Sequence, residues 1–328
     1  MKKFLSILAV LPFLTFAQTN ISNPKLPLIE SVCSDTIKGK YHETVFSYDG
    51  FNRLILIVNR VGYLRKSNST AKTTWVLDTT AIQKFGYVSN QKAPIYKINT
   101  SYRSNDIGSK RITSTETYYY KYENGKRVMD SVVSKRTIDG KSVKDFFNTT
   151  YDQTDSTLTR LTNRSTRHYP SELQNDFEFH ENIIAEKNAF NQGNPGAWSY
   201  DYTFTNFDNK RNPFAQFNIA PILLDERIRF SFKKDELINL NTDFDKDGTE
   251  INWHLMNQNN LLRSTMKRPD TDSDATDIIS FSYSYNQHQL PVYCTIYVKK
   301  VSTGSGITSF RSGYLKHITF RYKNKRSS

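Results

Sequence analysis

The stretch Phe46-Ser47-Tyr48-Asp49-Gly50, continued by a return segment from Arg53 to Val58, decides the fold of this chain. It places two aromatic residues at alternate positions, then an Asp-Gly pair, and then a basic residue followed by aliphatic residues. Side chains alternate between the two faces of a strand, and Asp-Gly and Asn-Gly pairs accept the positive φ angles of tight turns. The stretch therefore predicts an antiparallel hairpin with one solvated face.

Variants of this unit recur along the 328 residues. They are Tyr120-Lys121-Tyr122-Glu123-Asn124-Gly125 before Arg127 to Val133, Phe204 through Asp208-Asn209, and Phe281-Ser282-Tyr283-Ser284-Tyr285-Asn286 before Leu290 to Val298. The pattern predicts an all-β fold: a long twisted antiparallel sheet of consecutive hairpins, or meander, with at most one or two short helices. The 20 Tyr and 21 Phe residues supply its core through cross-strand pairs.

The N-terminus has the pattern of a secretory signal peptide. Lys2 and Lys3 precede an apolar run, Phe4 to Phe16, that is too short to span a bilayer, and the small residue Ala17 marks a cleavage site. A lipoprotein needs a cysteine at the cleavage point, but the first cysteine is Cys33. We therefore expect a secreted, periplasmic or cell-surface protein that is soluble after cleavage, is not a lipoprotein and has no later transmembrane segment.

The rest of the chain is predicted to form one domain. After the signal peptide (1–17), residues 18–40 are predicted to be an extended leader, residues 41–324 a single antiparallel β domain, and residues 325–328 a tail. Pro170 to Asn191 suits a helix or an irregular excursion, which marks a weak subdivision near 165–196. Pro221 to Glu226 is predicted to form one short helical turn.

The charge balance is strongly basic. The chain has 45 Lys and Arg against 32 Asp and Glu, and cleavage leaves 43 basic residues and a formal charge of +11. Such a surface adheres to anionic polymers in a salt-sensitive way, and export argues against nucleic acid as the partner. The basic residues are scattered along strands, which favours solvated positions on the outer face; examples are Arg127, Lys135, Arg136, Lys141 and Lys144.

Two segments resemble a known hairpin family. Tyr48-Asp49-Gly50-Phe51-Asn52-Arg53-Leu54 resembles the core of a YD repeat, the hairpin unit of secreted bacterial β-rich proteins. Tyr202 to Phe214, with its Asp-Asn-Lys and Asn-Pro-Phe turn, is similar to a segment of uncharacterised secreted bacterial proteins built from such hairpins. The resemblance spans roughly Tyr41 to Tyr322. It implies residence in the envelope or outside the cell, a long twisted antiparallel sheet, and no established chemistry.

One acidic motif suggests a cation. Asp243, Asp245 and Asp247, followed by Gly248, match the first half of a calcium loop, in which alternate oxygens surround a hard cation. The twelfth position is His254 where a bidentate Glu belongs, and a hairpin tip explains the Asp-Gly pair equally well. Calcium is thus a candidate, and we expect no other cofactor.

The aromatic and sulfur residues give two further candidate sites. Trp75, Trp198 and Trp253 are candidates for stacking on sugar rings, with core packing as the alternative. Trp198 stands out because it follows the turn Gly193-Asn194-Pro195-Gly196. Cys33 and Cys294 lie in a chain that leaves the reducing cytoplasm, so a disulfide is one interpretation and a buried free thiol within the strand around Cys294 is the other.

No catalytic motif appears in the sequence. It contains no Gly-x-Ser-x-Gly elbow, no His-Glu-x-x-His helix and no phosphate-binding glycine loop, and its six histidines lack metal-type spacing. Glu178-Phe179-His180-Glu181 brings an imidazole near carboxylates, but neighbours in a strand point to opposite faces. A glycosidase remains an alternative, because its two carboxylates can be far apart in sequence.

The function we expect is non-enzymatic binding or a structural role, with contact to anionic envelope or extracellular polysaccharide. One alternative is an envelope scaffold that pairs with another protein through sheet edges. A second is a polysaccharide hydrolase. An outer-membrane barrel is a further alternative, disfavoured because its lipid face needs apolar alternation.

Overall fold

The structure of the protein is a computed structural model. It describes residues 27–36, 39–66, 73–89, 91, 93–104, 110–124, 126–138, 141–165, 170–190, 198–214, 227–232, 249–254, 257–268, 274–304 and 307–323. The strands in these residues are β1 (Ile29–Ser34), β2 (Lys40–Tyr48), β3 (Leu54–Lys66), β4 (Thr73–Gly86), β5 (Tyr96–Ser104), β6 (Lys110–Glu123), β7 (Lys126–Ile138), β8 (Lys141–Gln153), β9 (Thr157–Ser165), β10 (Pro170–Phe179), β11 (Ile183–Phe190), β12 (Trp198–Arg211), β13 (Arg227–Phe232), β14 (Thr249–His254), β15 (Asn259–Arg268), β16 (Asp274–Tyr285), β17 (Pro291–Gly304) and β18 (Ile307–Tyr322). The predicted all-β class is confirmed.

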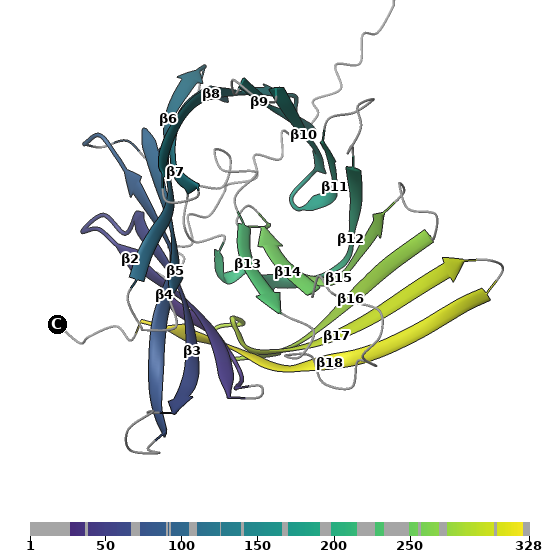
Figure 1. The fold of residues 1–328 in the computed structure, drawn as a ribbon. Helices are drawn as coiled ribbons and strands as arrows, with labels where there is room; N and C mark the ends of the chain where they lie inside the picture. The colour runs from purple at the N-terminus through teal and green to yellow at the C-terminus, as the bar shows by residue number, and fades with distance from the viewer. Residues whose placement is uncertain are drawn as a thin grey trace, which may run out of the picture.

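The described strands form a closed antiparallel barrel and one separate hairpin (Figure 1). Consecutive strands pair from β1 to β12, then β12 pairs with β15, and the meander continues to β18. The predicted meander is therefore confirmed, but the sheet has no free edge among these strands because β1 pairs with both β2 and β18. Closure removes the edges that pairing with another protein would need.

The closing strand comes from the segment predicted to be a leader. Val32 lies opposite Thr44 on one side and Phe320 on the other, and both Ile29 and Val32 are fully buried. The prolines Pro24 and Pro27 precede this strand and do not interrupt it. The expectation of an extended leader over residues 18–40 is thus wrong for Ile29–Ser34, because a short apolar segment gains its hydrogen bonds from two distant strands.

The predicted helix or excursion at Pro170 to Asn191 is also wrong. This segment forms β10 and β11, which continue the barrel from β9 to β12 without a break. Inward Asn175 and Phe177 alternate with outward Gln174 and Asp176, so the period is that of a strand. Pairing on both sides outweighs the helical preference of the glutamates.

Two distant hairpins share one turn geometry. Asp49 Oδ1 accepts the N–H groups of Phe51 and Arg53, and Asn286 Oδ1 likewise accepts those of residues 288 and 290. The third residue after each Asx has a positive φ, 61° at Asn52 and 60° at Gln289. The same Asx turn therefore sets the register of β2–β3 and of β16–β17.

Tyrosines close the end of the barrel where these turns lie. The hydroxyls of Tyr48, Tyr87, Tyr122 and Tyr322 donate to the backbone carbonyls of Ile29, Leu54, Pro94 and Pro291, at 2.7–2.8 Å. Burial raises the pKa of Tyr48, Tyr87 and Tyr322 above the usual value. These phenols are held neutral, so each acts as a donor that ties one hairpin to its neighbour.

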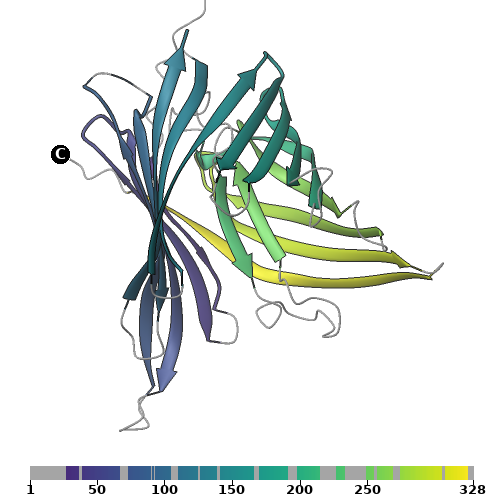
Figure 2. The same cartoon turned by 45° about the horizontal axis from the view of Figure 1, so that its top comes forward.

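The β13–β14 hairpin lies inside the ring of strands (Figures 1 and 2). Trp253 of β14 packs against Phe281 at 5.8 Å and Phe320 at 6.2 Å between ring centroids, and its Nε1–H donates to Tyr283 at 3.1 Å. Phe214 lies between Phe46 and Phe320. Aromatic rings of the hairpin and of the barrel strands therefore pack together inside the barrel. The described part of the chain contains no helix with the length and apolarity needed to cross a bilayer.

Candidate binding surface

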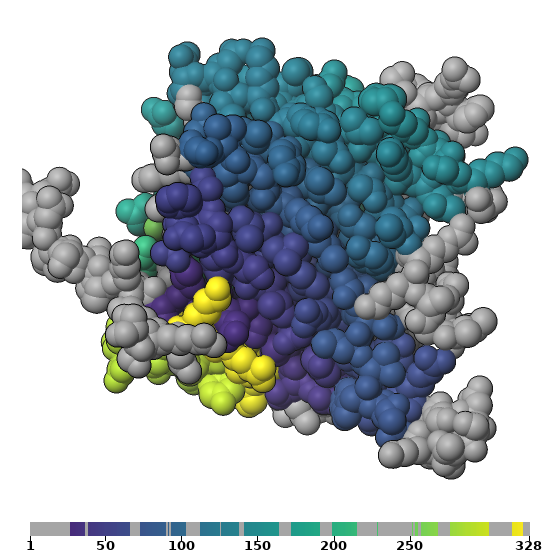
Figure 3. All heavy atoms as spheres, turned by 90° about the vertical axis from the view of Figure 1, so that its left-hand side faces the viewer, coloured from purple at the N-terminus to yellow at the C-terminus, as the bar shows by residue number. Residues whose placement is uncertain are grey.

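The outer face of strands β4 to β8, called here the outer wall, carries exposed aromatic and basic side chains. Strand β8 shows the pattern most clearly: Lys144 and Phe146 are exposed, whereas Phe147 and Thr149 are buried. Alternate residues face opposite sides of a strand, so one face of β8 carries Lys144, Phe146 and Asn148 and the other face packs on the core. Figure 3 shows the outer wall as one broad surface.

Register brings two lysines of this wall together. Lys135 of β7 lies directly opposite Lys144 of β8, and both are exposed. Residues directly opposite in an antiparallel pair have Cβ atoms ~5 Å apart, and like charges there destabilise the sheet. The Lys144 ammonium lies 4.6 Å from the centroid of the Phe146 ring. The site is thus a positive pair beside an exposed aromatic ring.

Three large aromatic side chains stand on the outer wall. Trp75 is 53% exposed, Tyr119 53% and Phe146 61%. The Trp75 ring is 5.7 Å from that of Tyr41, which lies over Gly62. A Cβ at Gly62 would lie 2.0 Å from Cε1 of Tyr41, so only glycine leaves room for this ring against the backbone.

The remaining charges of the region are partly paired. Glu43 and Arg60 form an ion pair at 3.5 Å, and Lys121 and Glu123 form one at 2.8 Å. Lys84 is exposed on the same face as the lysine pair. Lys84, Lys135 and Lys144 are thus exposed basic residues of the outer wall, whereas the Glu43–Arg60 pair lies on the adjoining strands β2 and β3.

Two basic residues expected on the outer face do not contribute to it. Arg127 is 4% exposed and points inward, where its Nε–H donates to Asp130 at 2.8 Å and its guanidinium lies 4.3 Å from the rings of Tyr120 and Tyr151. Arg136 forms an ion pair with Asp145. The interpretation of both as solvated outer positions is wrong, because their register places them on the inner face. Lys135 and Lys144 are exposed on the outer face as expected, whereas Lys141 is exposed but lies on the same side of β8 as Asp145.

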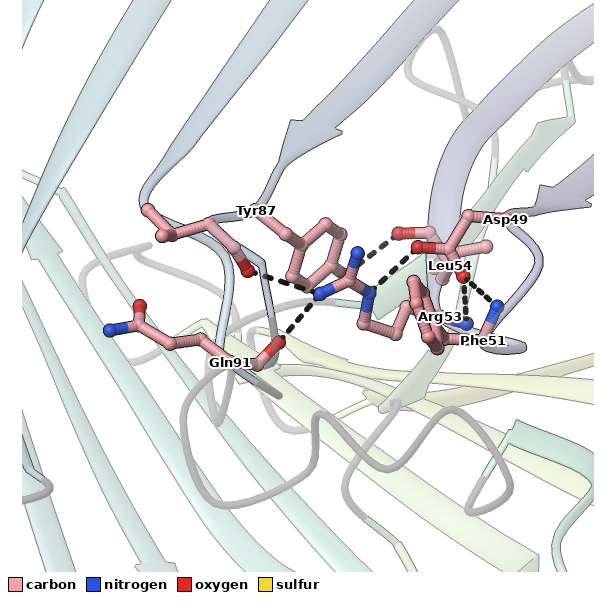
Figure 4. Close-up of polar contacts among 7 residues, drawn as sticks. Asp49, Phe51, Arg53, Leu54, Tyr87 and Gln91 are labelled. Atoms are coloured by element: carbon pink, nitrogen blue, oxygen red, sulfur yellow. Dashed lines mark hydrogen bonds and ion pairs between the residues drawn. The ribbon is translucent and has the colours of Figure 1, made fainter.

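Arg53, the basic residue of the YD-like segment, has a structural role (Figure 4). Its Nε–H donates to Asp49 at 2.7 Å, and one terminal nitrogen donates to the carbonyls of Val88 and Gln91 at 3.2 and 2.8 Å. Its guanidinium lies over the rings of Phe51 and Tyr87. Arg53 therefore joins the β2–β3 turn to the β4–β5 connection.

The three tryptophans predicted to bind sugar lie in different places. Trp75 is on the outer wall, whereas Trp253 is only 4% exposed inside the barrel. Trp198 begins β12 opposite Phe190, and the described part of the structure does not include its side chain. Trp75 and Trp253 therefore lie on different sides of the barrel wall, and of these two Trp75 is on a solvated face. The candidate calcium residues Asp243, Asp245 and Asp247 lie outside the described residues, as does the predicted helical turn at 221–226.

Cys33 and Cys294 are both free and buried, so no disulfide joins them. Cys33 lies opposite Thr319 and Cys294 lies opposite Ile318, and these successive residues of β18 face opposite sides of the sheet. Burial, with the nearby Glu43 carboxylate, raises the pKa of Cys33 to about 11, and burial raises the pKa of Cys294 further. The buried-thiol interpretation holds.

One buried polar pair has no signal in the sequence. His254 of β14 lies 3.4 Å from Glu186 of β11, between the rings of Phe177 and Phe204, and both polar side chains are almost fully buried. The pair fixes the inner hairpin to the barrel wall. Sequence reasoning missed it because insertion of the hairpin brings together strands that do not pair. Within the described ranges, no group of three His, Cys, Asp or Glu side chains is arranged to hold a metal ion.

Comparison with known proteins adds a likeness in shape. No protein-family model matches the sequence, and no curated protein matches it. The chain is similar to the crystal structure of a porin-like protein from Bacteroides uniformis ATCC 8492, with a TM-score of 0.46 and 7% identity over 90% of this chain and 96% of that one. It is also similar to a porin-like protein from Bacteroides vulgatus ATCC 8482, with a TM-score of 0.41 and 11% identity over 91% and 99%.

Proposed function

We propose that this protein is a non-enzymatic binding protein of the cell envelope or cell exterior, and that it binds anionic polysaccharide along the outer wall. The observation that carries the proposal is the Lys135–Lys144 pair beside the exposed ring of Phe146. A carboxylate or sulfate between the two ammonium groups would remove their repulsion. The aromatic ring would stack on the apolar face of the adjoining sugar.

The shape of the outer wall supports an extended ligand. Its strands run side by side, so outward-facing side chains form rows across the sheet: one row contains Thr115, Lys135 and Lys144, and the next contains Thr117, Val133 and Phe146. A polymer with repeated anionic units contacts several such rows at once. The formal charge of +13 for the whole chain further favours an anionic partner.

Retention on immobilised polysaccharide tests the proposal. Residues 18–328 are incubated with alginate, polygalacturonate and chondroitin sulfate over a salt series, with dextran as the uncharged comparison. The Lys135→Gln/Lys144→Gln variant should bind the anionic polymers about tenfold less tightly, because two exposed ionic contacts of up to ~1 kcal/mol each are lost. The matched control is Lys299→Gln, since Lys299 is exposed on β17 and lies opposite Ile278.

Two results would contradict the proposal. Equal retention of the wild type and the double lysine variant would place binding elsewhere, and release of new reducing ends from the same tubes would show a hydrolase. Retention that falls with salt in the wild type and is already low in the double variant would support it, because screening acts on the same charges.

A membrane-spanning barrel is the second candidate function, favoured by the closure of the strands of the meander into one barrel. Its outer face needs an apolar band. In this barrel, outward positions on four neighbouring strands carry charged residues instead of apolar ones. They are Asp176, Lys187, Asp201 and Lys267. Extraction of the native envelope with buffer and with detergent distinguishes the two candidate functions. Release by salt or buffer supports the polysaccharide-binding protein, and release by detergent alone supports the membrane barrel.

A further inference from the structure

The outer wall carries a third exposed lysine at its other side. Lys84 of β4 lies opposite Leu56 of β3 on one side and Ile98 of β5 on the other. Neither of these two cross-strand neighbours carries a charge, whereas Lys121 of β6 forms an ion pair with Glu123 at 2.8 Å. Lys84 is therefore an exposed ammonium group whose directly opposed residues supply no carboxylate.

Two rows of outward-facing side chains cross the wall from β8 to β4 (Figure 3). The row that starts at Phe146 ends at Lys84, and its other members are Val133, Thr117 and Ile98. The row of the lysine pair ends at Ile82, and its other members are Thr115 and Thr100. No member of these two rows carries a carboxylate. An acidic ligand therefore meets no like charge in either row on its way from the lysine pair to Lys84.

Two tyrosines adjoin the middle of these rows. Tyr119 of β6 is 53% exposed and lies opposite Tyr96 of β5. A Cβ at Gly86, which is opposite Tyr96 on β4, would lie 2.1 Å from Cε1 of the Tyr96 ring, so this ring lies against the backbone. Tyr119 follows Thr117 by two residues on one strand, so both side chains point outward. The wall thus presents aromatic rings and hydroxyl groups between its basic positions.

We infer that Lys84 is a second anion-binding position of the outer wall, which rests on the function proposed above for the Lys135–Lys144 pair. One polysaccharide chain lies across the strands and contacts both positions. Strands β4 and β8 are four inter-strand spacings of ~4.8 Å apart, so about 19 Å of sheet separates Lys84 from Lys144. A single acidic sugar is too short to contact both, and a chain of several sugars spans them.

The surface between the two positions suits the sugars that link the acidic groups. Apolar sugar faces stack on aromatic rings such as that of Tyr119, and sugar hydroxyls pair with the hydroxyl of Thr117. These linking sugars need no charge of their own. Once the lysine pair holds one acidic group, the next contact is intramolecular, so Lys84 adds to the affinity of long chains through effective concentration.

Oligomers of two lengths test this second position. Residues 18–328 are titrated against fluorescently labelled digalacturonate and decagalacturonate in moderate salt, and anisotropy reports binding. Lys84→Gln should weaken binding of the decamer about fivefold and leave the dimer unchanged, because only the decamer reaches from the lysine pair to Lys84. Lys135→Gln/Lys144→Gln should weaken binding of both oligomers.

Matched variants test the path and the charge. Thr117→Glu places a carboxylate between the two basic positions and should weaken binding of the decamer. Ser282→Glu adds the same charge at an exposed position of β16 and should have no effect on it. Lys299→Gln removes the same charge as Lys84→Gln, from β17, and should leave both oligomers unchanged. Thermal unfolding of each variant verifies that its fold is intact.

The outcomes separate the second position from the lysine pair. If Lys84→Gln changes neither oligomer, changes both equally, or acts no more strongly than Lys299→Gln, the second position is overturned and the lysine pair is unaffected. If the double lysine variant binds both oligomers as the wild type does, the proposed function itself fails. If the wild type binds neither oligomer, retention on immobilised polygalacturonate decides: a fall of about fivefold in Lys84→Gln alone supports the second position, and equal retention overturns it.

Discussion

At the scale of single residues, Gly62 shows how one missing side chain shapes the surface. Its position under the ring of Tyr41 predicts that Gly62→Val destabilises the fold by about 1–3 kcal/mol, because the added carbons displace the ring or the strand. Chemical denaturation measures the change. Gly50→Ala is the matched control, since nothing lies within 4 Å of its added Cβ, and it should change the free energy of unfolding by less than ~0.5 kcal/mol.

The two thiols lead to a second prediction at this scale. Burial raises the pKa of both, to about 11 for Cys33, so at pH 8 almost none of either is the reactive thiolate. Native protein should therefore resist iodoacetamide, and both residues should react after denaturation, as mass spectrometry would record. Rapid modification of the native state, or a mass gain of two hydrogens on reduction, would contradict the geometry described here.

At the scale of the element, repulsion between Lys135 and Lys144 destabilises the β7–β8 hairpin, and the proposed anionic ligand would relieve this repulsion. Lys135→Gln should raise the stability of the free protein by about 0.2–1 kcal/mol, because it abolishes the repulsion from Lys144 and keeps the contact of Lys144 with Phe146. Thermal unfolding at low salt measures the effect, which should shrink in high salt. Lys299→Gln, with no lysine opposite, should leave the midpoint unchanged; an equal gain in both variants would point to net charge and not to the pair.

The hairpins also show what the sequence reveals about this fold. Asx turns and alternating aromatic residues are local signals, so the all-β meander and the turns at Asp49 and Asn286 could be predicted. Barrel closure could not, because Val32 and Phe320 meet through a pairing that no local pattern encodes. Trp75 and Lys144 were visible as candidates, but their role depends on register: a shift of one residue would exchange the faces that hold Lys135 and Arg136.

At the scale of the whole molecule, β1 is the strand that completes the barrel. A truncated chain that begins at Asp35 and so lacks β1 should leave the edges of β2 and β18 unpaired and should associate into oligomers, because exposed edges pair with other chains. Size-exclusion chromatography with light scattering would show the change in mass. A truncated protein that stays monomeric with an unchanged melting temperature would mean that closure contributes little to the fold.

The strand order has one more consequence. The N–H of Lys323 donates to the carbonyl of Leu28 at 2.8 Å, so the two ends of the described chain are neighbours. The molecule is thus a ring in which the starting strand is arbitrary. A circularly permuted gene, opened at the tight turn of residues 154–157 and with a short glycine-serine linker between the old termini, should encode the same barrel.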